Sequence, residues 1–339
     1  MYLYCGVDLH STNSVVAVID DQGKRVLRRR APNDLHTILA LLEPVSSTLR
    51  GVVVESTYNW YWLVDGLMDA GFKVHLANPA AMKQYEGLKF TDDNSDATWL
   101  AEMLRLGILP QGYIYPKQER PTRDLLRKRS HLVRQRTANI LSIQNLVARN
   151  LGHGVKGDII KKWDNQDIVA LFPDPNLALA VSASHAVVRC LDEKIAELEK
   201  SVLAQVRLKP EYKVLLTTSG IGNILGLTIM LETGDVGRFP KVGNYASYCR
   251  CVSSKRMSNG KKKGKGNAKN GNKYLAWAYV EAATFAVRHH PNIRRFHQRK
   301  VSKTKLNVVA TKAVAHKLAR ACYHMMKEQV PFDVKRAFA

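Results

Sequence analysis

The sequence predicts an α/β domain at the N-terminus followed by a basic, mostly helical C-terminal part. Short apolar runs typical of buried strands alternate with helical patterns before residue 110. A seven-residue apolar repeat begins soon after Pro110. The charge changes at the same place, because residues 1–110 carry 10 Lys/Arg against 13 Asp/Glu and residues 111–339 carry 42 against 16. We therefore expect parts that differ in both architecture and partner.

Three antiparallel strands are expected first, because three apolar or β-branched runs are separated by short polar turns. Helical and strand patterns then alternate. The expected strands are Leu3–Val7, Ser14–Ile19, Arg25–Arg30, Gly51–Val54 and Phe72–Leu76, with helices ending near Leu42 and Ala70. This order is that of a ribonuclease-H-like fold.

Four carboxylates occupy special positions in that fold. Asp8 ends the first strand and Glu55 ends the fourth, while Asp93 and Asp96 share one face at the start of a helix. The two strands are neighbours in such a sheet and the helix packs across them, so the four side chains can meet. That arrangement could bind a pair of divalent ions about 3.5–4 Å apart for phosphoryl transfer. Mg²⁺ is the expected ion, because it prefers carboxylate oxygens as ligands. The alternative for Asp93 and Asp96 is capping of the helix.

A coiled-coil seam is predicted from Glu119 to Asn150, where apolar residues recur at an interval of seven. A second segment, His185–Val206, repeats the pattern. The two segments form either an antiparallel hairpin or an oligomerisation arm, and simple spacing between domains is a third possibility. We place the boundaries at residues 1–110, 111–208 and 209–339.

The net charge of +23 favours a nucleic-acid partner over a membrane surface. Ser219-Gly-Ile-Gly222 lies between two helical runs and could receive a phosphate, although a plain helix–helix corner explains it equally. Residues 253–273 contain eight basic residues and no acid, which indicates a flexible phosphate-facing loop or a disordered solubilising one. The predicted nucleic-acid contacts are Arg123, Arg127, Lys128, Arg134, Gly220, Gly222, Lys255, Arg256, Lys261, Lys262, Lys263 and Lys265.

Several classes of protein are disfavoured. The five cysteines include no C-x-x-C pair and their number is odd, which argues against a disulfide framework and against a zinc site. The sequence shows no secretory signal and no apolar run long enough to cross a bilayer, so we expect a soluble, cytoplasmic protein.

Several short motifs together resemble the RNA-guided insertion-sequence transposases with a four-acid D-E-D-D centre, the one-hundred-and-ten family of insertion sequences. The motifs, in chain order, are Gly6-Val-Asp8, Val54-Glu55-Ser-Thr, Asn78-Pro79, Asp93-x-x-Asp96-Ala97, Ser219-Gly-Ile-Gly222, Gly234-Asp235 with Arg238-Phe239, and Gly271-Asn272-Lys273-Tyr274-Leu275. The resemblance covers nearly the whole chain.

This resemblance implies a RuvC-like catalytic domain, a coiled-coil arm and a C-terminal transposase domain whose serine becomes joined to DNA through phosphate. Ser258, in Met257-Ser258-Asn259-Gly260, matches that serine. The family usually has Gly-Leu-x-Pro before it, whereas this chain has Arg250-Cys251-Val252-Ser253, which leaves Ser253 or Ser254 as alternatives.

The resemblance also implies the setting in which the protein works. It implies a bacterial or archaeal protein used at the nucleoid, which exchanges strands of donor and target DNA under direction of a non-coding bridge RNA. Two Mg²⁺ ions would occupy each composite site, and dimers would pair into a tetramer.

From the residues alone two other functions stay open. One is a metal-dependent, RuvC-like nuclease or junction resolvase that uses water in place of serine. The other is a non-catalytic nucleic-acid-binding protein in which the acids are structural.

Overall fold

The fold is described from a computed structural model, which covers residues 1–82, 93–206, 209–252, 256–264 and 270–338, without the side chains of residues 93–95, 256, 257 and 262. The chain divides into two compact units. One contains Met1–Lys117 with Ser254–Asn270, and the other contains Gln118–Ser253 with Gly271–Ala339. The arm and the C-terminal helices therefore share one unit.

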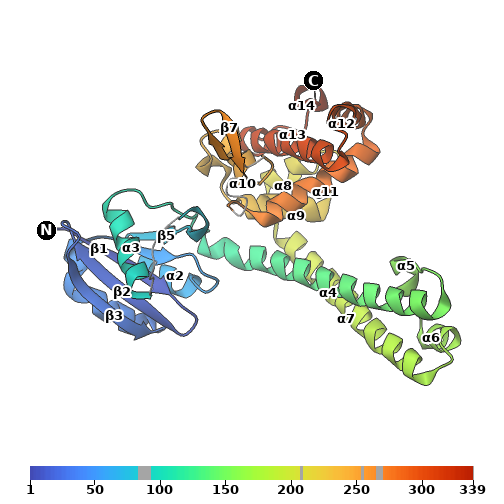
Figure 1. The fold of residues 1–339 in the computed structure, drawn as a ribbon, viewed down its shortest axis with the longest axis horizontal. Helices are drawn as coiled ribbons and strands as arrows, with labels where there is room; N and C mark the ends of the chain where they lie inside the picture. Colours follow the sequence, from blue (N-terminus) through green and yellow to red (C-terminus); the bar gives the residue numbers. More distant parts are fainter. Residues whose placement is uncertain (83–92, 207–208, 253–255, 265–269, 339) are drawn as a thin grey trace. The chain divides into compact units, whose positions relative to one another are not determined.

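The first unit is built on a five-stranded mixed sheet with the strand order β3-β2-β1-β4-β5 (Figure 1). The first three strands are antiparallel, whereas β4 is parallel to β1 and to β5. The elements are β1 (Leu3–Leu9), β2 (Asn13–Asp20), β3 (Arg25–Pro32), α1 (Leu35–Leu42), β4 (Leu49–Glu55), α2 (Tyr61–Asp69), β5 (Val74–Ala77) and α3 (Asp93–Arg105), with short 3₁₀ turns at Glu43–Thr48 and Pro79–Ala81. This order fits the predicted ribonuclease-H-like domain, and all five predicted strands are confirmed.

The two faces of this sheet are covered by different helices. Cys5, Val7 and Val54 face a core shared with α1 and α2. Val53 faces the other way, into a cluster with Leu100 of α3. Since side chains alternate along a strand, Gly6, Asp8 and Glu55 belong to the α3 face.

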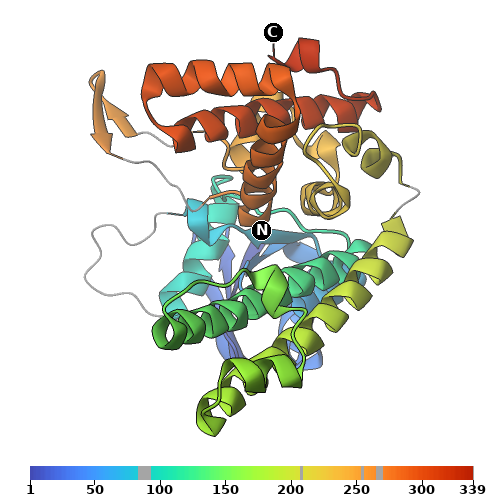
Figure 2. The same cartoon turned by 90° about the vertical axis from the view of Figure 1, so that its right-hand side faces the viewer.

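The second unit begins with an antiparallel pair of long helices, α4 (Arg120–Leu151) and α7 (Pro175–Val206), which run side by side in both views (Figures 1 and 2). Hydrogen bonds join Thr122 to Gln205 and Arg129 to Glu199, so residue numbers fall on one helix as they rise on the other. The predicted hairpin is therefore closed within one chain. Its tip holds the short helices α5 (Gly157–Ile160) and α6 (Asn165–Leu171).

Two arginines of α4 that lie in its contact with α7 each pair with an acid of α7. Arg129 Nε lies 2.7 Å from Glu199 Oε1, and Arg136 forms an ion pair with Asp192.

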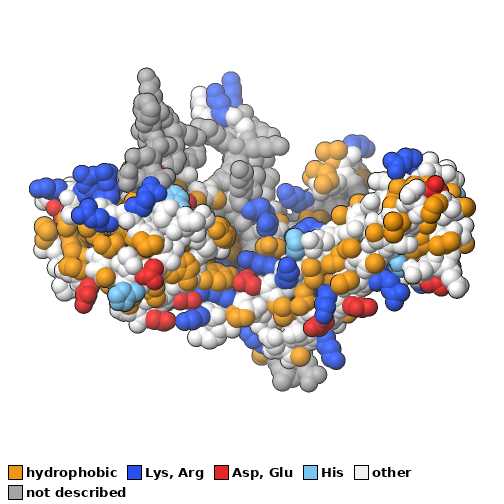
Figure 3. All heavy atoms as spheres, turned by 90° about the horizontal axis from the view of Figure 1, so that it is seen from below, with side chains coloured by type: hydrophobic (Ala, Val, Ile, Leu, Met, Phe, Trp, Pro, Cys, Tyr) orange, Lys and Arg blue, Asp and Glu red, His pale blue; other side chains and the backbone are white. Residues whose placement is uncertain are grey.

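Apolar side chains also remain exposed on the arm, among them Leu141, Val169 and Leu179. Hydrophobic side chains are visible between Lys and Arg on the face of the molecule drawn in Figure 3.

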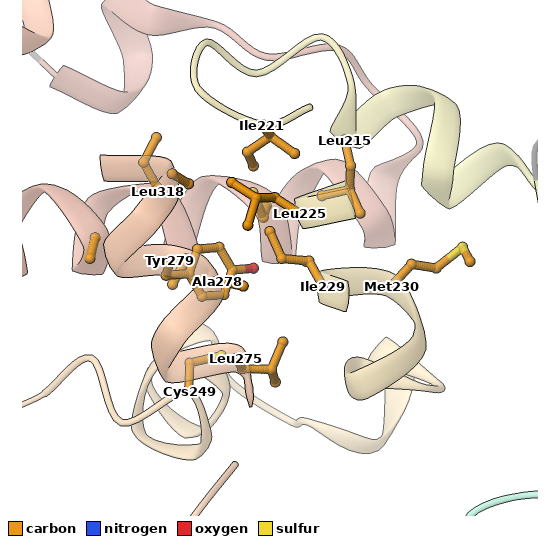
Figure 4. Close-up of a cluster of buried hydrophobic side chains, with 14 of the residues drawn as sticks. Leu215, Ile221, Leu225, Ile229, Met230, Cys249, Leu275, Ala278, Tyr279 and Leu318 are labelled. Carbon is orange, nitrogen blue, oxygen red and sulfur yellow. The ribbon is translucent and has the colours of Figure 1, made fainter. Parts of the chain in front are cut away.

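The remainder of this unit is helical and surrounds one core, to which Leu215, Ile229, Leu275 and Leu318 contribute (Figure 4). Its elements are α8 (Pro210–Leu215), α9 (Asn223–Thr233), α10 (Val242–Tyr248), α11 (Lys273–His289), α12 (Pro291–Thr304), α13 (Asn307–Glu328) and α14 (Val334–Phe338), with a 3₁₀ turn at Val236–Arg238. Among the described helices of the chain, none combines the length and apolarity needed to cross a membrane.

Candidate active site

Strand register places two predicted acids at one edge of the sheet. Val7 of β1 is the parallel partner of Val54 of β4, and Asp8 and Glu55 follow them directly. Both acids also lie on the α3 face of the sheet. The two carboxylates are therefore neighbours although 46 positions of sequence separate them.

Gly6 lets helix α3 approach β1 closely enough to bring a third acid to this edge. A Cβ atom at Gly6 would lie 2.0 Å from the Ala97 carbonyl oxygen and 2.8 Å from the Ala101 nitrogen. No side chain fits into that space. Asp96 immediately precedes Ala97, so the absence of a side chain at Gly6 sets the distance between Asp96 and the strand acids.

The electrostatics of Glu55 show that the three carboxylates share one environment. Burial, a hydrogen bond with Asp8 and the nearby charges of Asp8 and then Asp96 raise the pKa of Glu55 to about 7. Asp8 is itself only 3% exposed. Carboxylates held this close together, one of them buried, favour either a shared proton or a cation between them.

The fourth predicted acid, Asp93, begins helix α3, and its side chain lies outside the described residues. Asp93 and Asp96 are three residues apart on the same helix. Membership of Asp93 in the group thus stays a prediction from the sequence.

A histidine that the sequence reasoning overlooked also lies at this edge. His10 Nε2 is 3.2 Å from Asp8 Oδ2. The His10 carbonyl oxygen accepts hydrogen bonds from Asn33 Nδ2 and Asn59 Nδ2, at 2.9 Å and 3.0 Å. Those two amides fix the loop that leaves β1. His10 could have been identified from the sequence, because it lies two residues after Asp8 and alternate residues of a strand share a face.

The donor set at this edge fits a hard divalent cation, because it consists of carboxylate oxygens whose mutual repulsion a cation would relieve. The side chain of Asp93 is not described. Among the described side chains, no group of three His, Cys, Asp or Glu residues is arranged to coordinate a metal ion directly. Mg²⁺ in proteins usually keeps several water ligands and takes only one or two carboxylates directly. The residues present are consistent with that mode of binding.

Ser258, the predicted nucleophile, lies on a separate two-stranded sheet made of β6 (Arg256–Ser258) and β7 (Lys261–Gly264). The connecting residues Asn259 and Gly260 have φ angles of 47° and 71°, both in the left-handed region. Asn-Gly is the usual pair in a two-residue hairpin turn of this kind. Ser258 is exposed and directly precedes the turn, where it pairs with Lys261.

This hairpin corrects one expectation. Residues 253–273 were expected to form a flexible loop, whereas 256–264 form paired strands. The Asn259-Gly260 signal in the sequence was sufficient to predict the turn. The alternative nucleophiles Ser253 and Ser254 lie outside the described residues, as do Lys255 and Lys265.

The ends of the serine-bearing segment are fastened to the C-terminal helices. Asn272 N donates to the Tyr248 carbonyl oxygen at 2.6 Å, and Arg250 Nη2 donates to the Gly271 carbonyl oxygen at 3.0 Å. Asn272 also caps α11 and donates to Glu232 Oε2 at 2.7 Å. Glu232 is 3% exposed. The base of this segment, at Arg250, Gly271 and Asn272, is therefore fixed to α9 and α10.

Two of the arm arginines predicted to bind nucleic acid are engaged within their own unit. Arg127 forms a bidentate pair with Glu232, with N–O distances of 2.6 Å and 2.7 Å. Arg123 is buried, with its Nε 3.6 Å from Asp124 Oδ1. By contrast, exposed side chains are available to a partner at four of the predicted positions, Lys128, Arg134, Lys261 and Lys263. For Arg256 and Lys262 the side chains lie outside the description.

The glycines of the Ser219–Gly222 turn have different structural settings. Gly220 has a φ of +90°, and a Cβ there would lie 2.4 Å from the Ala282 carbonyl oxygen of α11. Close helix packing is thus sufficient reason for this glycine. Gly222 is the N-cap of α9, makes no side-chain cap and has open space around it.

Comparison with known proteins gives two family matches at separate places in the chain. A family model described as a transposase matches residues 5–149, and a second, described as the transposase IS116/IS110/IS902 family, matches residues 212–298. A protein of Pseudomonas aeruginosa named "Probable family 20 transposase" is 25% identical over 283 residues, which cover 79% of this chain and 81% of that protein. The two matched segments contain the acids and Ser258, respectively.

Proposed function

The chain belongs to the IS110 family of transposases, and on that premise we propose that it cuts and exchanges DNA strands with a carboxylate-bound divalent cation and a serine nucleophile. The convergence of Asp8, Glu55 and Asp96 at one sheet edge carries this proposal, because grouped carboxylates are the donor set of metal-dependent phosphoryl transfer. We assign Asp93 to the same set from its spacing on α3.

In this proposal the acids bind the cation and His10 orients one of them. Asp8, Glu55, Asp93 and Asp96 would hold Mg²⁺, with two ions in the complete site. The bound ions would neutralise charge on the phosphate and lower the pKa of an attached hydroxyl or water. His10 would keep the Asp8 carboxylate oriented through their 3.2 Å contact.

Ser258 would supply the nucleophile. Its Oγ would attack the phosphorus of a DNA phosphodiester, form a serine–phosphate bond and lose its proton. The bond from phosphorus to one sugar oxygen would break, and that oxygen would take up a proton as a free hydroxyl. Reversal with a different sugar hydroxyl would rejoin the strand without an external energy source. Lys261, directly opposite Ser258, is suited to stabilise charge on the phosphate.

Resemblance to the RNA-guided transposases supports a bridge RNA as the second nucleic-acid partner. The same resemblance supports a composite site made by several subunits, in which Ser258 approaches the acids of a neighbour once DNA is bound. The exposed Lys128 and Arg134 of the arm are available for phosphate contacts with either nucleic acid.

The test is incubation of the protein with its bridge RNA, donor DNA, target DNA and Mg²⁺, followed by denaturing electrophoresis. A covalent protein–DNA adduct is expected from the unmodified protein and none from Ser258→Ala. Asp8→Asn should give neither adduct nor cut DNA. Free cut ends without any adduct would replace serine chemistry by hydrolysis, and intact bound DNA would reduce the role to binding.

The subunit version has its own test. Inactive Ser258→Ala and inactive Asp93→Ala proteins are mixed and assayed for adduct. Restored adduct is expected if sites form between subunits. Demonstrated hetero-oligomers without adduct would place the serine and the acids of each site in one chain.

A further inference from the structure

A basic cavity of about 400 Å³ lies between helix α13 and the C-terminal segment that follows it. His316, Arg320 and His324 recur every four residues on one face of α13 and line it together with Lys317. Arg336 of α14 lines the opposite side. The cavity belongs to neither the acid cluster nor the serine hairpin.

The positive charge around this cavity is poorly balanced. Asp333 is its one acidic lining residue among those described, and its Oδ1 already accepts from the backbone nitrogens of Lys335 and Arg336. Glu328, next to the cavity, forms an ion pair with His324 at 2.8 Å, and its distance to Arg336 is longer, at 3.9 Å. The cations of the cavity thus outnumber its acids.

Helix α12 adds two further cations, Arg299 and Lys300, beside Lys317 of α13. Arg299, Lys300 and Lys317 gather round the Phe296 ring, with the charged centres 6.0, 5.6 and 5.2 Å from the ring centroid. Burial and the charges of Lys300, Arg299 and Arg320 lower the pKa of Lys317. Like charges gathered in this way disfavour one another, and a bound anion would relieve the repulsion.

The surrounding sequence indicates which anion. Residues 288–336 contain 13 Lys/Arg and two Asp/Glu, and Arg294, Arg295, Arg299, Lys303 and Lys312 are exposed along α12 and α13. An extended track of this kind matches a repeating phosphate chain better than a single carboxylate. The nearby rings of Phe296 and Phe338 are buried under the Lys317 stem, so they do not offer a stacking platform for bases.

We propose that the cavity is a binding site for the phosphodiester backbone of a nucleic acid, with Lys317, Arg320 and Arg336 as its phosphate ligands. The proposal rests on the proposed function, since it assumes a chain that handles nucleic acid. Lys317 is preorganised for this role because its Nζ is held by the Ala337 carbonyl oxygen at 2.8 Å. Contact to phosphate alone makes the site independent of base sequence.

The test uses full-length protein and fluorescent DNA and RNA oligonucleotides of the same sequence, with affinity measured over a range of salt concentrations. Arg320→Glu with Arg336→Glu removes two proposed phosphate contacts. The expected result is a loss of affinity of about tenfold or more, and a salt slope smaller by about two. Lys213→Glu with Lys241→Glu is the matched control, because it changes net charge equally at exposed residues that neither line the cavity nor belong to the basic stretch 288–336.

A loss of affinity larger than that of the control variant supports the site. If only DNA binding or only RNA binding is weakened, that nucleic acid is the source of the phosphate. An equal loss in both double variants, or no loss, overturns it, since only long-range attraction would then remain. If charge reversal prevents folding, Arg320→Gln with Arg336→Gln must still reduce the salt slope.

The failure of this site can be told apart from failure of the proposed function. Asp8→Asn should abolish strand cutting and leave the affinity and salt slope unchanged. Conversely, strand cutting by the unmodified protein together with unaltered binding by the cavity variants would overturn the cavity alone.

Discussion

The carboxylate edge and the serine hairpin are built on opposite principles. Asp8 and Glu55 are brought together by sheet register across 46 positions of sequence, and Asp96 is pressed against them by a glycine contact. Ser258 is exposed and is placed by a turn of two residues. The comparison teaches that the fold brings the acids together from distant segments, whereas the serine is presented on a locally built hairpin. Substitutions in the two regions should therefore fail in different ways.

The largest effect is expected from removing one acid without changing its size. Asp96→Asn should reduce adduct formation by about a thousandfold or more, because the cation would lose a charged ligand. Glu102→Gln is the control on the same helix, since Glu102 pairs with Arg105 on the surface of α3. Equal activity of the two variants in the adduct assay would remove Asp96 from the site.

Gly6→Ala should damage the acid edge by moving α3. A methyl group 2.0 Å from the Ala97 carbonyl oxygen cannot be accommodated, so we expect a loss of about 3 kcal/mol or more in unfolding free energy and a loss of activity. Gly112→Ala is the control, because its Cβ would meet Leu76 at 3.5 Å, an ordinary contact. Denaturant unfolding measures the difference, and unaltered stability of Gly6→Ala would refute the close approach.

The base of the serine-bearing segment should be sensitive to the partly buried ion pair between Arg127 and Glu232, since Glu232 also holds Asn272. Glu232→Ala leaves Arg127 without its bidentate partner and should cost about 3 kcal/mol of stability. Thermal unfolding measures that loss. Glu197→Ala, which breaks the exposed pair with Lys194, should have little effect. A Glu232 variant as stable as Glu197→Ala would show that the pair does not anchor this base.

The serine hairpin itself should respond more weakly. Gly260→Ala puts a side chain on a residue with a φ of 71° and should cost about 1 kcal/mol of local strain. Adduct formation should fall modestly while binding of the cation stays unchanged. Gly243→Ala, at a helix position where an added Cβ would meet nothing within 4 Å, should leave adduct formation intact. A simultaneous loss of cation binding in Gly260→Ala would contradict the separation of the two regions.

The last expected effect is on the pH dependence of the cation-free protein. Burial and the Asp8 and Asp96 carboxylates raise the pKa of Glu55 from 4.5 to about 7, so the folded protein holds a proton there that the unfolded chain releases. Stability from this group is present below pH 4.5 and is lost as the pH rises through 7. Melting temperatures in chelator should therefore fall over that interval, and Glu55→Gln should flatten the profile. An unchanged slope in Glu55→Gln would assign the dependence to other groups.

Much of the acid edge could be predicted because strands and amphipathic helices have regular periods. The runs around Val7, Val16 and Val53 are short and continuously apolar, as in strands buried on both faces, and their order gives the topology. His10 and the hairpin were missed although signals existed, namely the spacing from Asp8 and the Asn259-Gly260 pair. The sequence predicts helices at Tyr274–Arg288 and Leu306–Glu328 but not helix α12 between them, since its many Lys and Arg side chains obscure the apolar positions Ile293 and Phe296. The engagement of Arg127 by Glu232 depends on packing between distant segments and has no local signal.

Cation binding by the free protein tests the central claim most directly. If the fold alone assembles the carboxylates, Mn²⁺ measured by electron paramagnetic resonance should bind without DNA or RNA to the unmodified protein, to Ser258→Ala and to Glu102→Gln. Binding should be lost in Asp8→Asn and in Asp96→Asn. Equal Mn²⁺ binding by the unmodified protein and by Asp8→Asn would contradict the account, because the carboxylate edge would then not be the metal centre.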